Sequence, residues 1–134
     1  MGLGIISNQP YSPNGIILKK ETSDATPANL VNDASEFNIE DENVYLLKIH
    51  VVAKNATDDT SAGWNFFGLL DNISAPSWLV FDRGIISEGG SGFSLEDVSI
   101  GVTAGTPDEL NIEVTGKAGK TIRWTAFIEW VDVK

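Results

Sequence analysis

The residues that could take part in catalysis are few and scattered in this chain. His50 is the single histidine, and the chain contains no cysteine. A general base normally acts on a nearby nucleophile or orients a reacting group, and no serine stands in a G-x-S-x-G context beside it. An isolated histidine in an alternating segment is typically solvated or part of an interface. We therefore predict that the protein is not an enzyme.

Two acidic clusters could in principle hold a metal ion. They are Glu40-Asp41-Glu42 and Asp58-Asp59. Neither has the spaced D-x-[DN]-x-[DN]-G pattern that arranges ligands around calcium, so solvated loop charge is the expectation. Gly89-Gly90-Ser91-Gly92 lacks the Lys-Ser/Thr pair of a phosphate-binding loop. The sequence thus predicts no metal site and no cofactor.

The charge balance excludes some classes of partner. Nine basic and nineteen acidic residues give a formal net charge of −10, and Lys19-Lys20 is the one adjacent basic pair. A duplex-binding protein needs clustered cations to displace counterions from phosphates, so we expect no nucleic-acid partner. No apolar run is long enough to span a membrane, and the N-terminus does not resemble a signal peptide. We expect a protein made in a cytoplasm, whose acidity favours solubility or complements a basic partner surface.

Hydrophobic alternation predicts strands along most of the chain and no convincing helix. Strands are expected at 15–20, near Phe37 and Ile39, at 44–54, 64–70 and 78–86, at 93–102 with a bulge at Glu96-Asp97, and in the last 25 residues. One helical turn is an alternative for 28–31. About eight short strands with turn-rich links predict an all-β fold, a single-domain antiparallel β-sandwich of jelly-roll type. We expect residues 1–14 to form an extended N-terminal arm and residues 15–134 to form the sandwich.

Residues 110–134 show the clearest pattern and predict a β-hairpin. Apolar and polar residues alternate on both sides of Gly116-Lys117-Ala118-Gly119, and four residues bounded by glycines make an ordinary hairpin loop. Trp124 and Trp130 fall on the apolar face of the last strand. We expect them, with most of the other large aromatic residues, in the core rather than on a ligand-binding platform. Phe127 interrupts the polar face and is therefore an interface candidate.

The same segment, VTGKAGKTIRWTAFIEWVDV, resembles the closing segment of a group of small all-β phage and prophage proteins. These proteins typically end in a V-T-G-x-A-G-K-T-I-R-W-x-A motif followed by an alternating strand. The matching residues here are Val114, Thr115, Gly116, Ala118, Gly119, Lys120, Thr121, Ile122, Arg123, Trp124 and Ala126. The resemblance covers about twenty-five residues and is loose upstream. Such segments occur in tail-fibre-like proteins and in short virion proteins.

The resemblance implies a structural protein of the virion that works by assembly. The leading hypothesis is a capsid decoration (cement) protein on the capsid surface, a homotrimer that clamps neighbouring capsomers of the major capsid protein. A chain without a shaft repeat before the β domain favours this hypothesis. The predicted subunit interface contains Phe127, Arg123 and Glu129. The predicted capsid-contact arm contains Ile5, Ile6, Tyr11, Ile16 and Ile17.

Two alternatives remain open. The first is a receptor-binding module of a tail fibre or spike that recognises host surface glycans. This alternative predicts at least one exposed tryptophan as a stacking platform. The second is a free-standing carbohydrate-binding domain of a bacterial enzyme system. The sequence favours it less, because neither a linker nor an export signal is evident.

Overall fold

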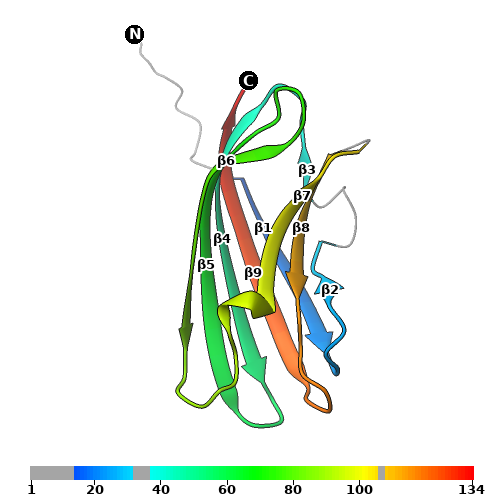
Figure 1. The fold of residues 1–134 in the computed structure, drawn as a ribbon, viewed down its shortest axis with the longest axis vertical. Helices are drawn as coiled ribbons and strands as arrows, with labels where there is room; N and C mark the ends of the chain where they lie inside the picture. The colour runs from blue at the N-terminus through cyan, green and yellow to red at the C-terminus, as the bar shows by residue number, and fades with distance from the viewer. Residues whose placement is uncertain (1–13, 32–36, 106–107) are drawn as a thin grey trace.

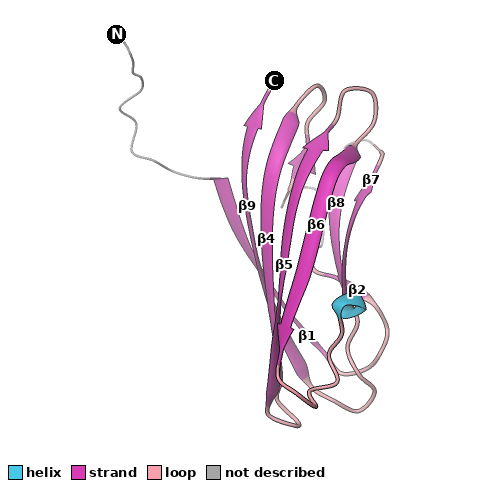
Figure 2. Ribbon diagram, turned by 60° about the vertical axis from the view of Figure 1, so that its left-hand side comes forward, coloured by secondary structure: helices cyan, strands magenta, loops and turns pink. Residues whose placement is uncertain are grey.

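The computed structural model describes residues 14–31, 37–105 and 108–134. These residues form nine strands packed as two antiparallel sheets, which confirms the predicted all-β sandwich (Figures 1 and 2). In this part of the chain no helix is long and apolar enough to cross a membrane. The strands are β1 (Asn14–Thr22), β2 (Ala28–Asn29), β3 (Asn38–Ile39), β4 (Val44–Asn55), β5 (Thr60–Asp71), β6 (Ser77–Ser87), β7 (Val98–Thr103), β8 (Asp108–Val114) and β9 (Ile122–Val133).

The two sheets differ in size. The large sheet has five strands in the order β1-β9-β4-β5-β6. In the small sheet, β8 lies between β7 on one side and the two-residue strands β2 and β3 on the other. Three consecutive strands, β4 to β6, stay within the large sheet as a meander. This strand order does not confirm the jelly-roll connectivity that we expected.

The predicted C-terminal hairpin is wrong. β8 belongs to the small sheet, whereas β9 pairs with β1 and β4 in the large sheet, so the segment between them crosses from one layer to the other. A tight turn does form inside this crossing, where the Lys120 N–H donates to the Lys117 carbonyl and Gly119 has φ +72°. Alternation identified both strands but could not identify their partners. β9 has twelve residues and pairs with the long strands β1 and β4, whereas β8 has only seven residues and could pair with only part of β9.

Two local expectations are also corrected. Residues 28–31, expected in a loop with one helical turn as the alternative, contain the two-residue strand β2 instead of a helical turn. The Asn29 side chain accepts hydrogen bonds from the N–H groups of Val31 and Ile112 and fixes the chain against β8. The interruption at Glu96-Asp97 is a short 3-10 helix, η1 (Leu95–Asp97), rather than a bulge. The Asp97 carboxylate accepts the Ser94 N–H at 2.8 Å, which satisfies a free donor at the start of this helix.

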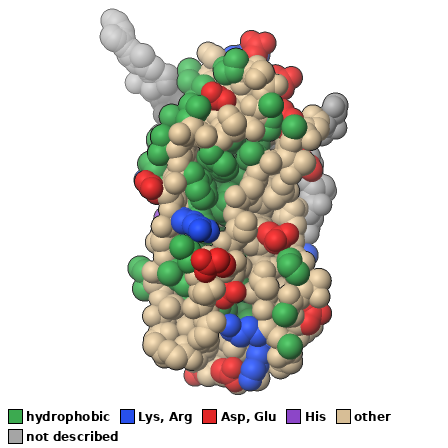
Figure 3. Space-filling model, viewed as in Figure 1, with side chains coloured by type: hydrophobic (Ala, Val, Ile, Leu, Met, Phe, Trp, Pro, Cys, Tyr) green, Lys and Arg blue, Asp and Glu red, His purple; other side chains and the backbone are tan. Residues whose placement is uncertain are grey.

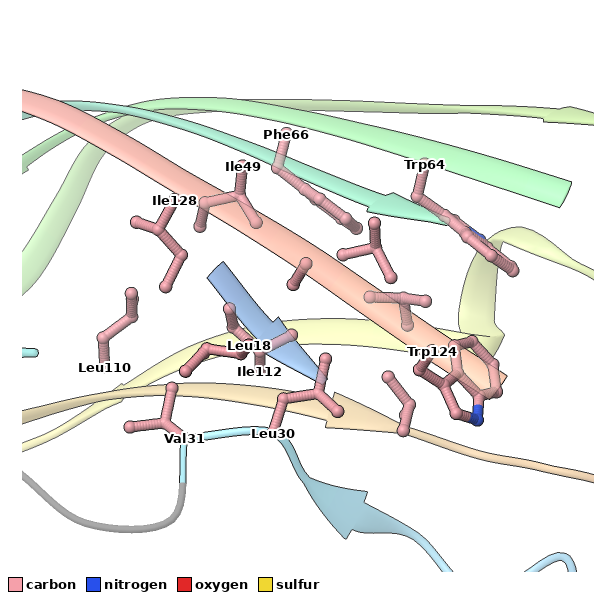
Figure 4. Close-up of a cluster of buried hydrophobic side chains, with 14 of the residues drawn as sticks. Leu18, Leu30, Val31, Ile49, Trp64, Phe66, Leu110, Ile112, Trp124 and Ile128 are labelled. Carbon is pink, nitrogen blue, oxygen red and sulfur yellow. The ribbon is translucent and has the colours of Figure 1, made fainter. Parts of the chain in front are cut away.

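The core lies between the sheets and is built from alternate residues of each strand. Along β4 the buried and exposed positions alternate over almost the whole strand, as a period of two requires. Trp64 and Trp124 are each 1% exposed, and Figure 4 shows them at one end of the buried cluster. Their ring centroids lie 5.7 Å apart, and Phe93 packs edge-on against Trp64. The expectation that these tryptophans are core residues is confirmed.

Asn72 ties the two sheets together at the end of β5. It is buried, and its Nδ2 lies 3.2 Å from the Ile39 carbonyl oxygen and 2.9 Å from Asp108 Oδ2. The Asp108 carboxylate also accepts the Gly105 N–H at 2.8 Å. These donors favour the charged carboxylate, first Gly105 and then Asn72, so the pKa of Asp108 is lowered from its ordinary value.

Acid should therefore weaken this junction. Because the folded-state pKa of Asp108 lies below the unfolded value of about 3.9, its stabilisation is present above about pH 4 and is lost as the pH falls through the folded pKa. We expect Asp108→Asn to lower the melting temperature at pH 7 and to flatten its decline between about pH 4 and pH 2. Circular dichroism melts of both proteins across this range would check it. Parallel declines would show that Asp108 does not contribute.

Candidate functional site: the outer face of the large sheet

The outer face of the large sheet, turned away from the small sheet, collects most of the exposed apolar side chains. Among the described residues ten large apolar side chains are exposed, and eight of them point from this face. They are Ile17, Leu46, Val52, Phe67, Val80, Ile86, Val131 and Val133. Leu79 is the unpaired residue of a bulge in β6, and Ile73 lies in the loop before β6. Scattered apolar residues are ordinary, but a concentration on one face indicates a contact surface.

The charges on this face cancel. Its basic residues are Lys19, Lys48, Lys54 and Arg123, and its acidic residues are Glu21, Asp71, Asp82 and Glu129. Because the whole chain has nine basic and nineteen acidic residues, the net charge of −10 lies entirely elsewhere in the molecule. Figure 3 shows acidic side chains spread over the surface in that view. The same view shows apolar side chains in a hollow beside the small sheet. The outer face is thus neutral on an otherwise acidic protein.

One end of this face forms a continuous aliphatic patch. Pairing places Leu46 of β4 between Val131 of β9 and Leu69 of β5, and Leu69 lies opposite Val80 of β6. The next outward-facing pair on β9 and β4 is Val133 and Val44. We call these residues the aliphatic patch: Val44, Leu46, Leu69, Val80, Val131 and Val133. Four are exposed and two are half-buried. Asp71 borders the patch at one end of the strands, and Lys48, Glu129 and Asp82 border it in the next outward row.

Polar groups gather in the middle of the same face. A shallow depression of about 350 Å³ lies over β4, β5 and the edge strand β6, and Phe67, His50 and Asn65 line it. His50 Nδ1 lies 2.6 Å from Asn65 Oδ1, and Lys48 Nζ lies 5.7 Å from the centre of the Phe67 ring. Gly84, which also lines the depression, has no side chain, and no atom lies within 4 Å of the position that its Cβ would occupy. The floor of the depression is therefore open at this residue. An exposed aromatic ring among hydrogen-bonding side chains can receive a small polar ligand.

The predicted interface residues all lie on this face. Phe127 is half-buried between Ile17 and His50, and the edge of its ring covers Gly15, where a Cβ would lie 3.0 Å from Phe127 Cε1. Glu129 lies opposite Lys48, and Arg123 forms an ion pair with Glu21 of the same chain at 3.2 Å. The structure therefore brings the three residues onto one strip of β9, with Arg123 already paired within its own subunit.

The predicted arm divides into two parts. Ile16 and Ile17 do not belong to it, because they lie in β1 opposite Ile128 and Phe127. Their place in a regular strand follows from the twelve-residue β9, which offers β1 a partner as far as Asn14. The other predicted arm residues, Ile5, Ile6 and Tyr11, lie outside the described residues.

The acidic clusters behave as surface charge. Asp58 pairs with Lys120 at 2.9 Å and Asp59 with Lys54 at 3.0 Å. Within residues 14–31, 37–105 and 108–134, no three His, Asp or Glu side chains come together as metal ligands would. His50 lies on the outer face, as its position in the alternation predicted, with an amide rather than a nucleophile beside it.

The aliphatic patch was missed from the sequence, although a signal for it exists. Val44 and Leu46 occupy positions on the polar phase of β4, and Val131 and Val133 occupy the polar phase of β9. Apolar residues at such positions indicate a strand that is covered on both faces. These positions can be recognised as one patch only when the register that aligns them across four strands is known.

Comparison with known proteins does not assign a family. No protein-family model matches the chain, and no curated protein matches it either. Among solved structures, the chain is similar to the tailspike protein of Acinetobacter phage vB_ApiP_P1, with 11% sequence identity and a TM-score of 0.36 over 98% of this chain. The chain spans about a quarter of the length of that tailspike, since 24% of the tailspike chain is covered.

Proposed function

We propose that the protein is a structural protein of a bacteriophage virion, a capsid decoration protein that clamps neighbouring capsomers as a trimer. The observation that carries this proposal is the outer face of the large sheet, which has most of the exposed large apolar side chains and no net charge on an acidic molecule. A face of this kind is suited to contact with another protein surface. The resemblance of residues 114–126 to the closing motif of small phage proteins supports the virion setting.

In this proposal two surfaces have different partners. The strip of Phe127, Arg123 and Glu129 lies at the seam between subunits, where an apolar ring repeated around a symmetry axis excludes water. Ile5, Ile6 and Tyr11 belong to an arm that contacts the major capsid protein. A ligand that binds only the assembled lattice shifts disassembly by its own binding free energy, and this is how such a protein would stabilise a capsid.

Phe127→Glu should weaken the trimer while the β domain stays folded. The new carboxylates would face one another and would replace an apolar contact by a charge that needs solvent. Light scattering would measure the oligomer, and circular dichroism would confirm the fold. Ile73→Glu, which adds the same charge at an exposed loop residue outside this face, is the matched control. An unchanged trimer in the Phe127 variant would remove this residue from the seam.

Reconstitution tests the decoration function directly. Purified protein is added to phage heads that lack it, and the temperature at which the heads release DNA is recorded. Saturation at about a hundred times the dissociation constant stabilises each site by about 2.7 kcal/mol, so the release temperature should rise. Heads that release DNA at the same temperature with and without bound protein would contradict a cement function.

The depression at Phe67 supports a second candidate function, a receptor-binding module of a tail fibre that binds host glycans. The exposed tryptophan that this alternative predicted is not found, since all four tryptophans are buried or half-buried. Phe67, which is 45% exposed beside Lys48, His50 and Asn65, would serve as the platform instead. Calorimetric titration with fragments of host polysaccharide should then show binding that Phe67→Ala abolishes. Binding that is equal in both proteins would exclude this site.

A further inference from the structure

We propose that the aliphatic patch is the surface through which copies of this chain bind one another. This inference specifies the subunit contact of the proposed assembly and therefore rests on it. It also extends the contact beyond the strip at Phe127, because Val131 and Val133 continue the same face of β9 toward the C-terminus. The patch lies on β9, β4, β5 and β6, which run side by side in Figure 2.

The chemistry of the patch suits a protein contact rather than a soluble ligand. Val80, Val131 and Val133 are 59%, 54% and 65% exposed, and Leu46 is 38% exposed. Valine has one restricted side-chain torsion, so little conformational entropy is lost when it is covered. The polar residues of this face, including Lys48 and Glu129, belong to the neighbouring row and would lie at the rim of the contact. An apolar centre with a polar rim is the usual organisation of an interface.

The charge distribution points to a second copy as the occupant. Every copy has a net charge of −10, and this excess lies off the outer face. Two copies that meet through their other surfaces repel each other, whereas two neutral outer faces approach without this cost. A basic partner would instead be drawn to the acidic surfaces. The neutral face is therefore the one on which a like-charged copy is best tolerated.

The size of the face matches a stable interface. The whole outer face, with the patch at one end and the strip at Phe127 in the middle, has five strands about 4.8 Å apart and up to about 40 Å long, which gives about 800 Å². This is the area that each partner contributes to a standard protein–protein interface.

Sedimentation velocity of the full chain tests the proposal. We compare the wild type with Val131→Glu and with Ile73→Glu, a matched control that adds the same charge at a residue 63% exposed in the loop outside the face. We expect the wild type to self-associate, Val131→Glu to raise the dissociation constant at least about tenfold, and Ile73→Glu to leave it unchanged. A monomeric wild type up to about 100 µM would overturn the proposal, since contacts weaker than this are at the limit of specific association. Equal effects of the two variants on the dissociation constant would also overturn the proposal.

Cysteine cross-linking provides an independent measurement. The chain has no cysteine, so Val131→Cys or Ile73→Cys introduces a single thiol. Copies that meet through the patch bring the Val131→Cys thiols close enough to cross-link with a short bifunctional maleimide, whereas Ile73→Cys should stay uncoupled. Equal coupling in both would overturn the proposal. Self-association with no binding to phage heads would leave this contact standing and refute the decoration function instead.

Discussion

Replacing Trp124 with alanine should lower the free energy of unfolding by about 3–5 kcal/mol, the largest single effect we expect in this molecule. The side chain is 1% exposed, and its ring centroid lies 5.7 Å from that of Trp64 and 6.1 Å from that of Phe93. Its Nε1 donates to Thr22 Oγ1 at 3.0 Å. The substitution would open a cavity at one end of the core and remove the partner of a buried hydroxyl.

Urea denaturation of Trp124→Ala measures this loss. Domains of this kind are typically stable by about 5–15 kcal/mol, so the variant should unfold at a much lower urea concentration. Trp124→Phe keeps most of the volume and should fall between the two proteins. Thr125→Ala, the exposed neighbour on the opposite face, should stay within about 0.5 kcal/mol of the wild type. A Trp124→Ala variant as stable as Thr125→Ala would show that this ring does not support the core.

The second large effect is expected at Gly116. This residue is buried where the chain crosses between the sheets, and a Cβ there would lie 2.5 Å from Thr22 Oγ1 and 2.6 Å from the Asp24 carbonyl oxygen. The Asp24 atom belongs to the backbone and cannot move aside as the tip of a side chain could. Gly116→Ala should therefore destabilise the fold by about 3 kcal/mol, the upper part of the range for overpacking.

Gly101→Ala is the matched control for this prediction. Gly101 lies in β7, and no atom is within 4 Å of the position its Cβ would take. Alanine there should change the stability by less than about 0.5 kcal/mol. Thermal melts of the two variants in parallel make the comparison. If Gly116→Ala melts at the wild-type temperature, the close approach to Thr22 and Asp24 does not hold in solution.

The contacts of Gly116 and Trp124 indicate what the C-terminal motif contributes to the fold. Gly116 and Trp124 both contact Thr22, the buried last residue of β1, one by close approach and the other by a hydrogen bond. Lys120 of the motif pairs with Asp58, and Arg123 pairs with Glu21. The motif therefore fixes the crossing between the two sheets. Its buried residues act in folding, and apart from Arg123 the proposed contact surface lies on the residues that follow and on the neighbouring strands.

Local pattern was sufficient for the long strands of the large sheet and for the core. The alternation in β4 and β9 placed Leu47, Ile49, Trp124 and Ile128 inside, and all four are buried. It was insufficient for pairing, because a period of two says which face a residue occupies but not which strand lies beside it. The hairpin error came from this gap: the Gly-bounded segment 116–119 does turn, but the chain then continues into the other sheet.

The candidate site, too, could be predicted only in part from the local sequence pattern. Phe127 was identified because it interrupts the polar face of its strand between Thr125 and Glu129, and the structure places it on the outer face as expected. The aliphatic patch needed the register of four strands, since Leu46, Leu69, Val80 and Val131 are separated in sequence by up to 85 residues and become neighbours only through pairing. Long-range pairing is decided by the packing of the whole sandwich, so no local signal contains it.

The most direct test of the account is the location of the protein on intact particles. Phage particles purified from a host that produces the protein are labelled with a gold-conjugated antibody against it and imaged by electron microscopy. A structural decoration function predicts gold scattered over the head. Gold confined to the tail would contradict it and would favour a receptor-binding function through the depression at Phe67.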